Sequence, residues 1–288
     1  MAYPMIENNI SNVLLIDGKL VSSNSEQAME FFEPCYDIIY YETVRIYKGV
    51  LLFLEDHLER LTASVKASEG FYVDTKFIKF ALINYLDALA LGEYDGNMRI
   101  VITRDHTVFH ICEANIPTED LFKTGIATNI LQWERVAPHV KVFRSEYKEA
   151  VAQKFSEDTP YGKPYEVLLE NKRGELTEGS KSNFFAIVDG EIYSAPNDLI
   201  LIGITRKYVL DALKKAGLTL RFATFNMQKL TDPSHKVALF VSSTPFDILP
   251  IASVNEYKFD SANDELVLRI MKMYKEIVDS YYEEHKND

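Results

Sequence analysis

A glycine and a threonine stand directly before an apolar helical pattern in the segment Gly203-Ile204-Thr205-Arg206. The first backbone N–H groups of a helix have no partner inside it, and the helix dipole favours negative charge at that end. The amides of Ile204 and Thr205, with the Thr205 hydroxyl, could therefore bind a small anion such as a phosphate. Ordinary capping by Thr205 is the commoner role at such a position, and this segment alone does not exclude it.

A second polar segment, TEGSKSN at residues 177–183, precedes an apolar strand pattern that starts at Phe184. Its small side chains suggest a backbone held close to a bound group, with the carboxylate of Glu178 beside it. A solvent-exposed loop whose serines and asparagine bond their own backbone explains the same residues equally well.

Two cations are further candidates. Arg60 ends the HLERL turn of a helical pattern, from where it can reach a buried anion, although an ion pair with Asp56 one turn earlier is the simpler alternative. Lys141 follows an apolar residue and a proline-containing loop, a position that predicts an inward-facing strand or turn. A lysine becomes a Schiff-base nucleophile when burial or neighbouring cations lower its pKa, which sequence alone does not reveal.

The elements that must position these residues begin with three hairpins, whose turns are predicted at residues 17–18, 48–49 and 104–107. An apolar stripe with i, i+3, i+7 spacing predicts a helix from Glu55 that carries Arg60. A second helix is predicted from about residue 75 to residue 91, where Gly92 would end it.

The second half of the chain returns to the same mixture. Strands are predicted over residues 166–169, 184–188 and 192–194, and a helix over 206–216 with Gly217 as its cap. A long terminal helix is predicted from an apolar stripe formed by Leu266, Ile270, Met273, Ile277 and Tyr281. Strands in groups and helices in groups favour an α+β fold.

The segment from Ala114 to Gly125 contains Pro117 and mixed charges without a sustained period. We therefore predict a smaller N-terminal α+β domain over residues 1–116, a linker over 117–125 and a larger C-terminal domain over 126–288.

Composition excludes several classes of function. The 31 basic and 43 acidic side chains give a formal net charge of −12, which argues against nucleic acid or anionic lipid as a main partner. No apolar run approaches a membrane span, and the only cysteines are Cys35 and Cys112. We expect no membrane association and a cytoplasmic protein with reduced thiols. The histidines and cysteines lack metal-ligand spacing, so no metal site is predicted. The sequence also contains no nucleophile elbow and no phosphate-binding glycine loop.

Taken in order, the motifs resemble the class IV, fold-type IV aminotransferases, a group that includes branched-chain and D-amino-acid aminotransferases and aminodeoxychorismate lyase. The resemblance runs from about residue 13 to residue 258 and is most specific in TEGSKSNFFAIVDGEIYSAP and GITRKYVLDALKKAGL. It implies a two-domain α+β fold, pyridoxal 5′-phosphate (PLP) as cofactor, with residues 126–288 as the cofactor-binding domain, and a homodimer that completes its pocket with partner loops. Paired aromatics such as Phe31-Phe32 and Tyr40-Tyr41 are compatible with an interface, although core positions are their commoner fate.

The resemblance also implies residue roles. Lys141 would form the Schiff base and act as general acid–base, and Glu178 would pair with the pyridine nitrogen. The remaining cofactor contacts that it implies are Arg60, Ile204, Thr205 and Thr244 around the phosphate and Ser180, Ser182 and Asn183 along the wall. Tyr41 and Ser243 are the predicted substrate-binding residues.

The implied reaction moves an amino group from an amino donor to a 2-oxo acid acceptor in two half-reactions. A lyase that releases pyruvate with the same lysine, and a cofactor-binding relative with altered chemistry, remain alternatives. Two departures from relatives keep them open: Asp37-Ile-Ile-Tyr-Tyr41 replaces a glycine-containing wall, and Glu146 stands where branched-chain enzymes tend to have tyrosine.

Overall fold

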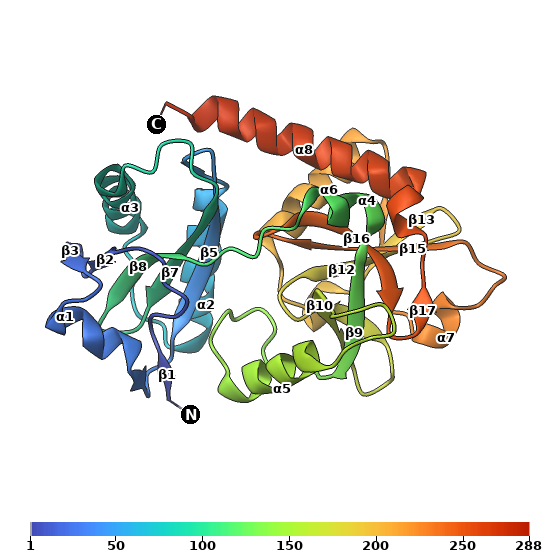
Figure 1. Ribbon diagram of the computed structural model, residues 1–288, viewed down its shortest axis with the longest axis horizontal. Helices are drawn as coiled ribbons and strands as arrows, with labels where there is room; N and C mark the ends of the chain where they lie inside the picture. The colour runs from blue at the N-terminus through green and yellow to red at the C-terminus, as the bar shows by residue number, and fades with distance from the viewer. Residues whose placement is uncertain (1, 288) are drawn as a thin grey trace. The chain divides into compact units, whose positions relative to one another are not determined.

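The computed structural model describes residues 2–287, and contact clustering divides the chain into two compact units. Unit 1 contains the chain up to Ile116, the segment Val140–Ser145 and the residues from Tyr281 onward. Unit 2 contains Pro117–His139 and Glu146–Ser280. Figure 1 follows the order of the elements along the chain.

Unit 1 is built on a six-stranded sheet in the order β3-β2-β8-β7-β5-β6. Its strands are β2 (Val13–Ile16), β3 (Lys19–Ser22), β5 (Tyr40–Tyr47), β6 (Val50–Leu51), β7 (Gly96–Ile102) and β8 (Thr107–Cys112). A small pair, β1 (Tyr3–Pro4) with β4 (Pro34–Cys35), and the short helices α1 (Glu26–Met29) and η1 (Glu30–Phe32) complete the N-terminal region.

The three predicted hairpins are confirmed, since β2 pairs with β3, β5 with β6 and β7 with β8, each pair antiparallel. At the first turn Asp17 and Gly18 have φ of 47° and 77°, and at the second Lys48 and Gly49 have 49° and 84°. This left-handed conformation matches the right-handed twist of the flanking strands.

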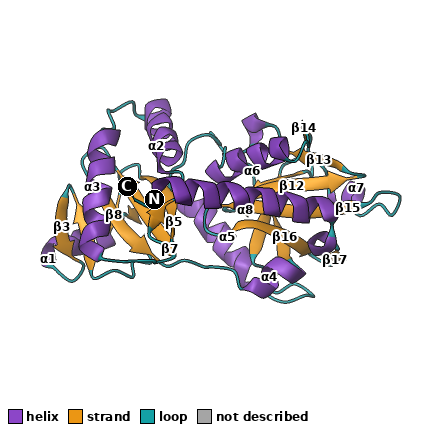
Figure 2. Cartoon of the chain, turned by 90° about the horizontal axis from the view of Figure 1, so that it is seen from above, coloured by secondary structure: helices purple, strands orange, loops and turns teal. Residues whose placement is uncertain are grey.

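Helices α2 (Leu54–Ser68) and α3 (Thr75–Leu89) pack on one face of this sheet (Figure 2). The predicted stripe of α2 is buried, with Leu61 1% and Val65 0% exposed. Helix α3 ends two residues before the predicted residue 91, because Ala90 takes the left-handed conformation and its N–H closes the last turn on Leu86 and Asp87. The predicted cap at Gly92 is therefore wrong.

Unit 2 is built on a mixed nine-stranded sheet in the order β11-β10-β9-β16-β15-β12-β13-β14, with β17 paired to β16. Its strands are β9 (Ile126–Gln132), β10 (Glu166–Glu170), β11 (Leu176–Gly179), β12 (Asn183–Val188), β13 (Glu191–Ser194), β14 (Leu220–Phe222), β15 (Val237–Ser243), β16 (Asp247–Val254) and β17 (Tyr257–Lys258). Periodicity does not predict β15, because its residues 238–243 are buried on both faces and show no polar alternation.

The helices of unit 2 pack on this sheet, with α6 against β15 and α4 against β16. They are α4 (Glu119–Thr124), α5 (Ser145–Ser156), α6 (Ile204–Lys215), α7 (Met227–Leu230) and α8 (Glu265–His285), with the short helices η2 (Asn197–Leu199) and η3 (Ser261–Asn263). Predicted helices 206–216 and 266 onward are thus confirmed in kind, and the α+β class is confirmed.

The buried seam of α8 differs from its predicted stripe. Val267, Ile270, Tyr274 and Val278 are 0–3% exposed, whereas the predicted Leu266, Met273 and Ile277 lie half-buried along its edge. Of the predicted stripe, only Ile270 lies in the buried seam. Helix α8 carries two adjacent apolar rows that differ by one residue. The row with Val267, Tyr274 and Val278 is buried, and the predicted row lies beside it.

Two segments depart from the continuous division expected from the sequence. Residues 119–124 of the expected linker form α4, which unit 2 contains. Unit 1 ends with the last turns of α8, where the Tyr281 hydroxyl donates to Glu55 at 3.0 Å and the Tyr281 ring meets Phe53 at 4.7 Å between centroids. Within residues 2–287, no helix is both long and apolar enough for a membrane crossing.

Candidate functional site

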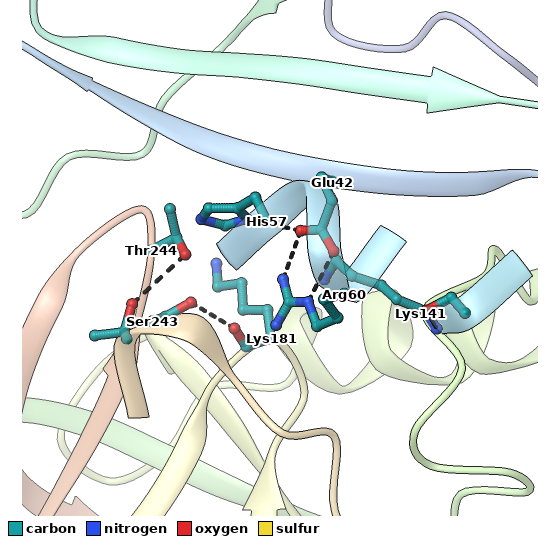
Figure 3. A network of polar contacts seen from close by, with 9 residues as sticks. Glu42, His57, Arg60, Lys141, Lys181, Ser243 and Thr244 are labelled. Carbon is teal, nitrogen blue, oxygen red and sulfur yellow. Dashed lines mark hydrogen bonds and ion pairs between the residues drawn. The ribbon is translucent and has the colours of Figure 1, made fainter. Parts of the chain in front are cut away.

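A buried carboxylate organises the predicted site residue Arg60 in unit 1. Glu42 on β5 receives Arg60 Nε at 2.7 Å on Oε1 and Arg60 Nη2 at 2.5 Å on Oε2. The Nδ1 of His57 lies 2.8 Å from the same Oε2, and because an ionised carboxylate only accepts, this nitrogen carries the proton. Figure 3 shows the carboxylate of Glu42 between the two side chains, with Lys141 beside them.

The charges of this cluster support one another. Burial alone would raise the pKa of Glu42, but the charge and hydrogen bonds of Arg60 and the hydrogen bond from His57 lower it to about 2. Burial lowers the pKa of His57, and the nearby charges of Arg60 and Lys141 lower it further against the pull of Glu42. At neutral pH the cluster therefore contains an ionised Glu42, a charged Arg60 and a neutral His57.

Lys141 belongs to unit 1, although the division predicted from the sequence places it in the domain 126–288. Backbone pairing explains the difference, because Val142 bridges Tyr40 and the Phe143 N–H donates to the Ile39 carbonyl at 3.1 Å. The Lys141 N–H donates to Ser64 Oγ on α2 at 3.2 Å. The Lys141 segment thus forms an added edge to β5, beside the helix that carries Arg60.

The aromatic ring of Tyr41 lies beside the amine of Lys141. Its Nζ lies 4.6 Å from the ring centroid of Tyr41, a predicted substrate-binding residue, and Tyr41 stacks on Phe143 at 4.1 Å between centroids. The guanidinium of Arg99 lies 5.0 Å from the Tyr41 ring. Cations over aromatic faces are attracted by the ring quadrupole, so Tyr41 holds two cations near one ring.

In unit 2, Glu178 lies on β11, the edge strand of the sheet, and is 2% exposed. Its Oε2 accepts the Leu201 N–H at 3.2 Å, and its Oε1 forms an ion pair with Arg135 Nε at 2.6 Å. Of the two alternatives considered for residues 177–183, the solvent-exposed loop does not hold at Glu178, which is a buried, charge-paired carboxylate.

The rest of that loop packs tightly. Ser180 donates through its N–H and its hydroxyl to Glu166 Oε1, at 3.2 and 2.6 Å, and Glu166 is fully buried. A Cβ on Gly179 would lie 2.0 Å from Ser182 Oγ, so this close approach requires glycine. The Ser182 hydroxyl is buried and has no hydrogen-bond partner among residues 2–287. A buried donor without a partner is costly and indicates a group that a ligand can satisfy.

The start of α6 combines the features expected of an anion site. Gly203 precedes the helix without a side-chain cap, and a Cβ there would lie 2.1 Å from Asn183 Oδ1. Asn183 fixes the approach by donating to the Leu201 carbonyl at 2.8 Å. The hydroxyls of Thr205 and Thr244 lie 3.5 Å apart, so two hydroxyls stand near the first amides of the helix.

Ser243, the second predicted substrate-binding residue, ends β15. Its hydroxyl donates to the Lys181 carbonyl at 2.5 Å, a contact visible in Figure 3. Because that proton is committed, Ser243 can offer a ligand only the lone pairs of its oxygen.

The structure therefore groups the predicted residues by unit. Arg60, Lys141 and Tyr41 lie together in unit 1. Those that belong to unit 2 are Glu178, Ser180, Ser182, Asn183, Ile204, Thr205, Ser243 and Thr244. No group of three or more histidine, cysteine or acidic side chains that could hold a metal ion occurs in the described part of the chain.

Sequence reasoning missed the supporting residues Glu42, His57, Arg135, Tyr147 and Glu166. A signal existed for two of them, since His57 belongs to the HLERL turn and Arg135 to the WERVAP segment. Neither signal names a partner, because each contact joins residues distant in the chain.

Comparison with known proteins gives one consistent answer. Residues 40–254 match the protein family described as amino-transferase class IV. Among curated proteins, a D-alanine aminotransferase of Listeria innocua is 27% identical over 229 residues, covering 75% of this chain and 78% of that protein. A putative branched-chain-amino-acid aminotransferase of Methanocaldococcus jannaschii is 24% identical and covers 92% of this chain and 96% of that protein.

Solved structures share the fold. A branched-chain amino acid aminotransferase of T.th., solved with pyridoxamine 5′-phosphate, superimposes with a TM-score of 0.78 at 18% identity, over 96% of this chain and 97% of that one. The enzyme from Escherichia coli gives a TM-score of 0.73 at 20% identity, over 93% and 94% of the two chains. The α+β architecture is that of these fold-type IV structures.

Proposed function

Because this chain belongs to the amino-transferase class IV family, we propose that it transfers amino groups between an amino acid and a 2-oxo acid through PLP held by Lys141. The chain is a PLP-dependent aminotransferase by family, and members of the family use this cofactor. The observation that carries the residue assignment is the cluster of Lys141 with Arg60, Glu42 and His57 in unit 1 (Figure 3).

The donor groups fit the chemistry of the cofactor. A phosphate dianion suits an arginine, a helix N-terminus and hydroxyls, which Arg60, the Ile204 and Thr205 amides, and Thr244 supply. The approach of Gly203 to Asn183 leaves no room for a side chain at the start of α6. The buried hydroxyl of Ser182 and the carboxylate of Glu178 match the polar edge of a pyridine ring.

When bound, PLP supplies an aldehyde carbon that captures amines and a ring that accepts electrons from the substrate α-carbon. Lys141 provides the amine that holds the aldehyde and, once released, the base that moves the α-proton. Its backbone is fixed by Ser64 and by the pairing of Val142 with Tyr40, so the side chain works from a rigid attachment. Glu178 favours a proton on the ring nitrogen, because a buried carboxylate stabilises a neighbouring cation.

The substrate side rests on Tyr41 and Ser243. The ring of Tyr41 forms an aromatic wall beside Lys141, and the Ser243 oxygen is restricted to accepting. The relatives comprise a D-alanine and a branched-chain aminotransferase, so both stereochemical series belong in the test.

The test is a screen of D- and L-amino donors against pyruvate and 2-oxoglutarate with cofactor-loaded protein, followed by borohydride reduction and peptide mapping. We expect amino transfer that requires an acceptor and an adduct on Lys141. Lys148 is the matched control, because burial lowers its pKa to about 8 and makes it the competing lysine. Lys141→Ala should lower turnover by about 10²–10⁴-fold, and Lys148→Ala should keep it.

An adduct on Lys148, or none, would refute the assignment of Lys141. Release of pyruvate without an acceptor would identify the lyase alternative instead.

We also propose a two-fold homodimer. Exposed apolar side chains support it, because Phe77 and Phe80 on α3 are 42% and 66% exposed and interfaces favour aromatic residues. Phe31 and Tyr40, two of the aromatics considered from sequence, are buried in the core of unit 1. Light scattering at micromolar concentration tests the proposal, and a fully active monomer would contradict it.

A cytoplasmic location is part of the same proposal. It is supported by the free thiols of Cys35 and Cys112, of which Cys112 is buried. Thiols persist in reducing compartments. Fractionation of cells that express the tagged protein checks this location, and recovery outside the cytoplasm would contradict it.

A further inference from the structure

Arg135 occupies the loop between β9 and the Lys141 segment and reaches Glu178 from there. The Arg135 Nε lies 2.6 Å from Glu178 Oε1, while its Nη2 donates to the Ser180 carbonyl at 3.1 Å. The Arg135 side chain is 21% exposed and that of Glu178 is 2% exposed. The guanidinium thus covers the buried carboxylate and holds the backbone two residues further along the same loop.

Tyr147 on α5 fixes the position of that guanidinium. The Arg135 carbon Cζ lies 4.8 Å from the Tyr147 ring centroid, and its Nη2 donates to the Tyr147 hydroxyl at 3.2 Å. The Tyr147 hydroxyl in turn donates to the Ser180 carbonyl at 2.7 Å. The Arg135 guanidinium is held by the ring and hydroxyl of Tyr147 and by the carbonyl of Ser180. It therefore has little freedom to turn away from Glu178.

The loop is also held from the opposite side. Glu166 on β10 accepts both the N–H and the hydroxyl of Ser180 on one oxygen. Ser180 is thereby bonded to the buried carboxyl group of Glu166 through its donors and to the Arg135 guanidinium through its carbonyl. Arg135, Tyr147 and Glu166 are titratable side chains that contact the Glu178 loop from neighbouring elements.

Charge decides what Glu178 can do. A buried carboxylate tends to take up a proton, because burial disfavours its charged form. An arginine in contact reverses this tendency, since the guanidinium stays charged at every accessible pH. A neutral acid can only donate to, or share a proton with, a ring nitrogen, whereas an anion stabilises a protonated one.

We propose that Arg135, oriented by Tyr147, is a positioning residue that keeps Glu178 ionised and aimed, so that the cofactor's ring nitrogen meets an anion. This inference rests on the proposed function, which assigns Glu178 to that nitrogen. Arg135 acts through Glu178 and needs no contact with the substrate.

The first test measures Glu178 directly in the full chain without cofactor. The ¹³C signal of its side-chain carboxyl is identified by its loss in Glu178→Gln and followed from pH 3 to pH 9. Arg135→Met should raise the midpoint of this signal by about one to three pH units. Arg135→Lys keeps the charge and should move the midpoint less than Met does.

Arg173→Met is the control, because Arg173 forms an exposed ion pair with Glu175 in the same unit. It should leave the Glu178 signal unchanged. An unchanged midpoint in folded Arg135→Met would overturn the proposal. If the Met variant does not fold, Arg135→Gln provides the neutral comparison: its Glu178 midpoint should rise in the same way, and an unchanged midpoint would overturn the proposal.

The second test compares the affinities for pyridoxal phosphate and for its 1-deaza analogue, which has carbon in place of the ring nitrogen. Wild type should prefer pyridoxal phosphate about tenfold or more, and Glu178→Gln should lose this preference, consistent with a charge-assisted hydrogen bond. Arg135→Met should lose most of it, while Arg173→Met keeps it. A ratio of affinities is insensitive to a general loss of stability.

The outcomes separate the two proposals. A wild-type preference that survives Arg135→Met overturns the role of Arg135 and leaves the assignment of Glu178 intact. No preference in wild type overturns the assignment of Glu178 in the proposed function, and with it the cofactor part of this inference.

Discussion

In unit 1 the fully buried Glu42 accepts hydrogen bonds from Arg60, whereas in unit 2 Arg135 forms an ion pair with the buried Glu178. Both pairs consist of an arginine and a glutamate. The residue assigned to the cofactor is the arginine, Arg60, in unit 1 and the glutamate, Glu178, in unit 2. In both pairs the acid lies deeper: Glu42 is 0% exposed against 12% for Arg60, and Glu178 is 2% exposed against 21% for Arg135.

The common depth has a physical reason. The arginine side chain is long, so part of its guanidinium can pair with a buried carboxylate while the rest stays near water. The glutamate side chain is shorter, so its carboxylate is buried when its backbone is buried. Burial therefore does not reveal which member of a pair meets a ligand. Substitutions at the supporting members should act through stability and ionisation, and those at the assigned members through cofactor binding and rate.

The largest effect on this comparison is expected from Glu42→Gln, which leaves Arg60 without its anion. We expect the free energy of unfolding in urea at pH 7 to fall by about 3–5 kcal/mol, as when one member of a buried pair is removed. Glu191→Gln is the matched control, since its Oε2 receives the Nε of Arg221 at 2.7 Å in an exposed ion pair, and it should cost less than about 1 kcal/mol.

The same variant has a signature in pH. The pKa of Glu42 is about 2 in the folded protein and near 4.5 when unfolded, so its stabilisation is complete above pH 4.5 and is lost as the pH falls toward 2. Glu42→Gln should remove that part of the acid dependence. Equal acid sensitivity of variant and wild type would contradict the charge assignment of the cluster.

Glu178→Gln tests the assigned acid of unit 2. The protein should still bind the cofactor, but removal of the substrate α-proton should slow by about 10²–10³-fold, the usual loss when one electrostatic contact to a reacting group is removed. Stopped-flow absorbance during a single half-reaction measures the rate. Wild-type rates in this variant would restrict Glu178 to a structural role in its loop.

Arg60→Ala tests the arginine of unit 1 that is assigned to the cofactor phosphate. Cofactor affinity should fall by about 1.5–3 kcal/mol, the value of a charge-assisted hydrogen bond, with a smaller effect on turnover at saturating cofactor. Thr205→Ala should act in the same direction but less. Arg104→Ala removes an exposed ion pair with Glu69 and serves as control in a fluorescence titration of the cofactor. Unchanged affinity in Arg60→Ala would leave Arg60 only as the partner of Glu42.

His110 in unit 1 shows what a buried polar group costs without an ion pair. It is 1% exposed, and its ring nitrogens make no hydrogen bond of normal geometry within residues 2–287. Burial, assisted by the charge of Arg99, lowers the pKa of His110 to about 3. Its neutral form therefore loses stability against the unfolded chain as the pH falls below 6.5.

Because of His110, the free energy of unfolding of the wild type should fall by about 2 kcal/mol between pH 7 and pH 5. His110→Leu should remove this fall. Urea unfolding at the two pH values measures it, with His106→Leu as control because His106 is exposed beside Asp17. If the two variants respond alike, the burial of His110 does not set the slope.

Local patterns predicted the parts of the molecule that depend on neighbours in the chain. The hairpin at Asp17-Gly18 follows from its turn residues, and the α2 face follows from its periodicity. The start of α6 is predicted within two residues because Gly203 and Thr205 mark it. Interactions of this kind are encoded within about one turn of backbone.

Partners across the fold could not be predicted in this way. Sequence spacing suggested Asp56 for Arg60, yet the structure brings Glu42 to it from a strand whose register places every second side chain toward α2. Arg135 meets Glu178 only after β9, β10 and β11 have paired in that order. These contacts depend on sheet order and register, which single-residue spacing does not encode.

The return of the chain to unit 1 at Tyr281 has a consequence for synthesis on the ribosome. The first 116 residues emerge early, but the side chains that bond Glu55 and pack on Phe53 and Tyr47 are made only after unit 2 has been translated. At about 5–20 residues per second, unit 1 waits for roughly 10–30 s with that surface of α2 uncovered. Nascent chains of this protein should therefore bind chaperones through their N-terminal third until Tyr281 and Tyr282 have emerged, which reverses the usual order in which the first-made domain is the first to be finished.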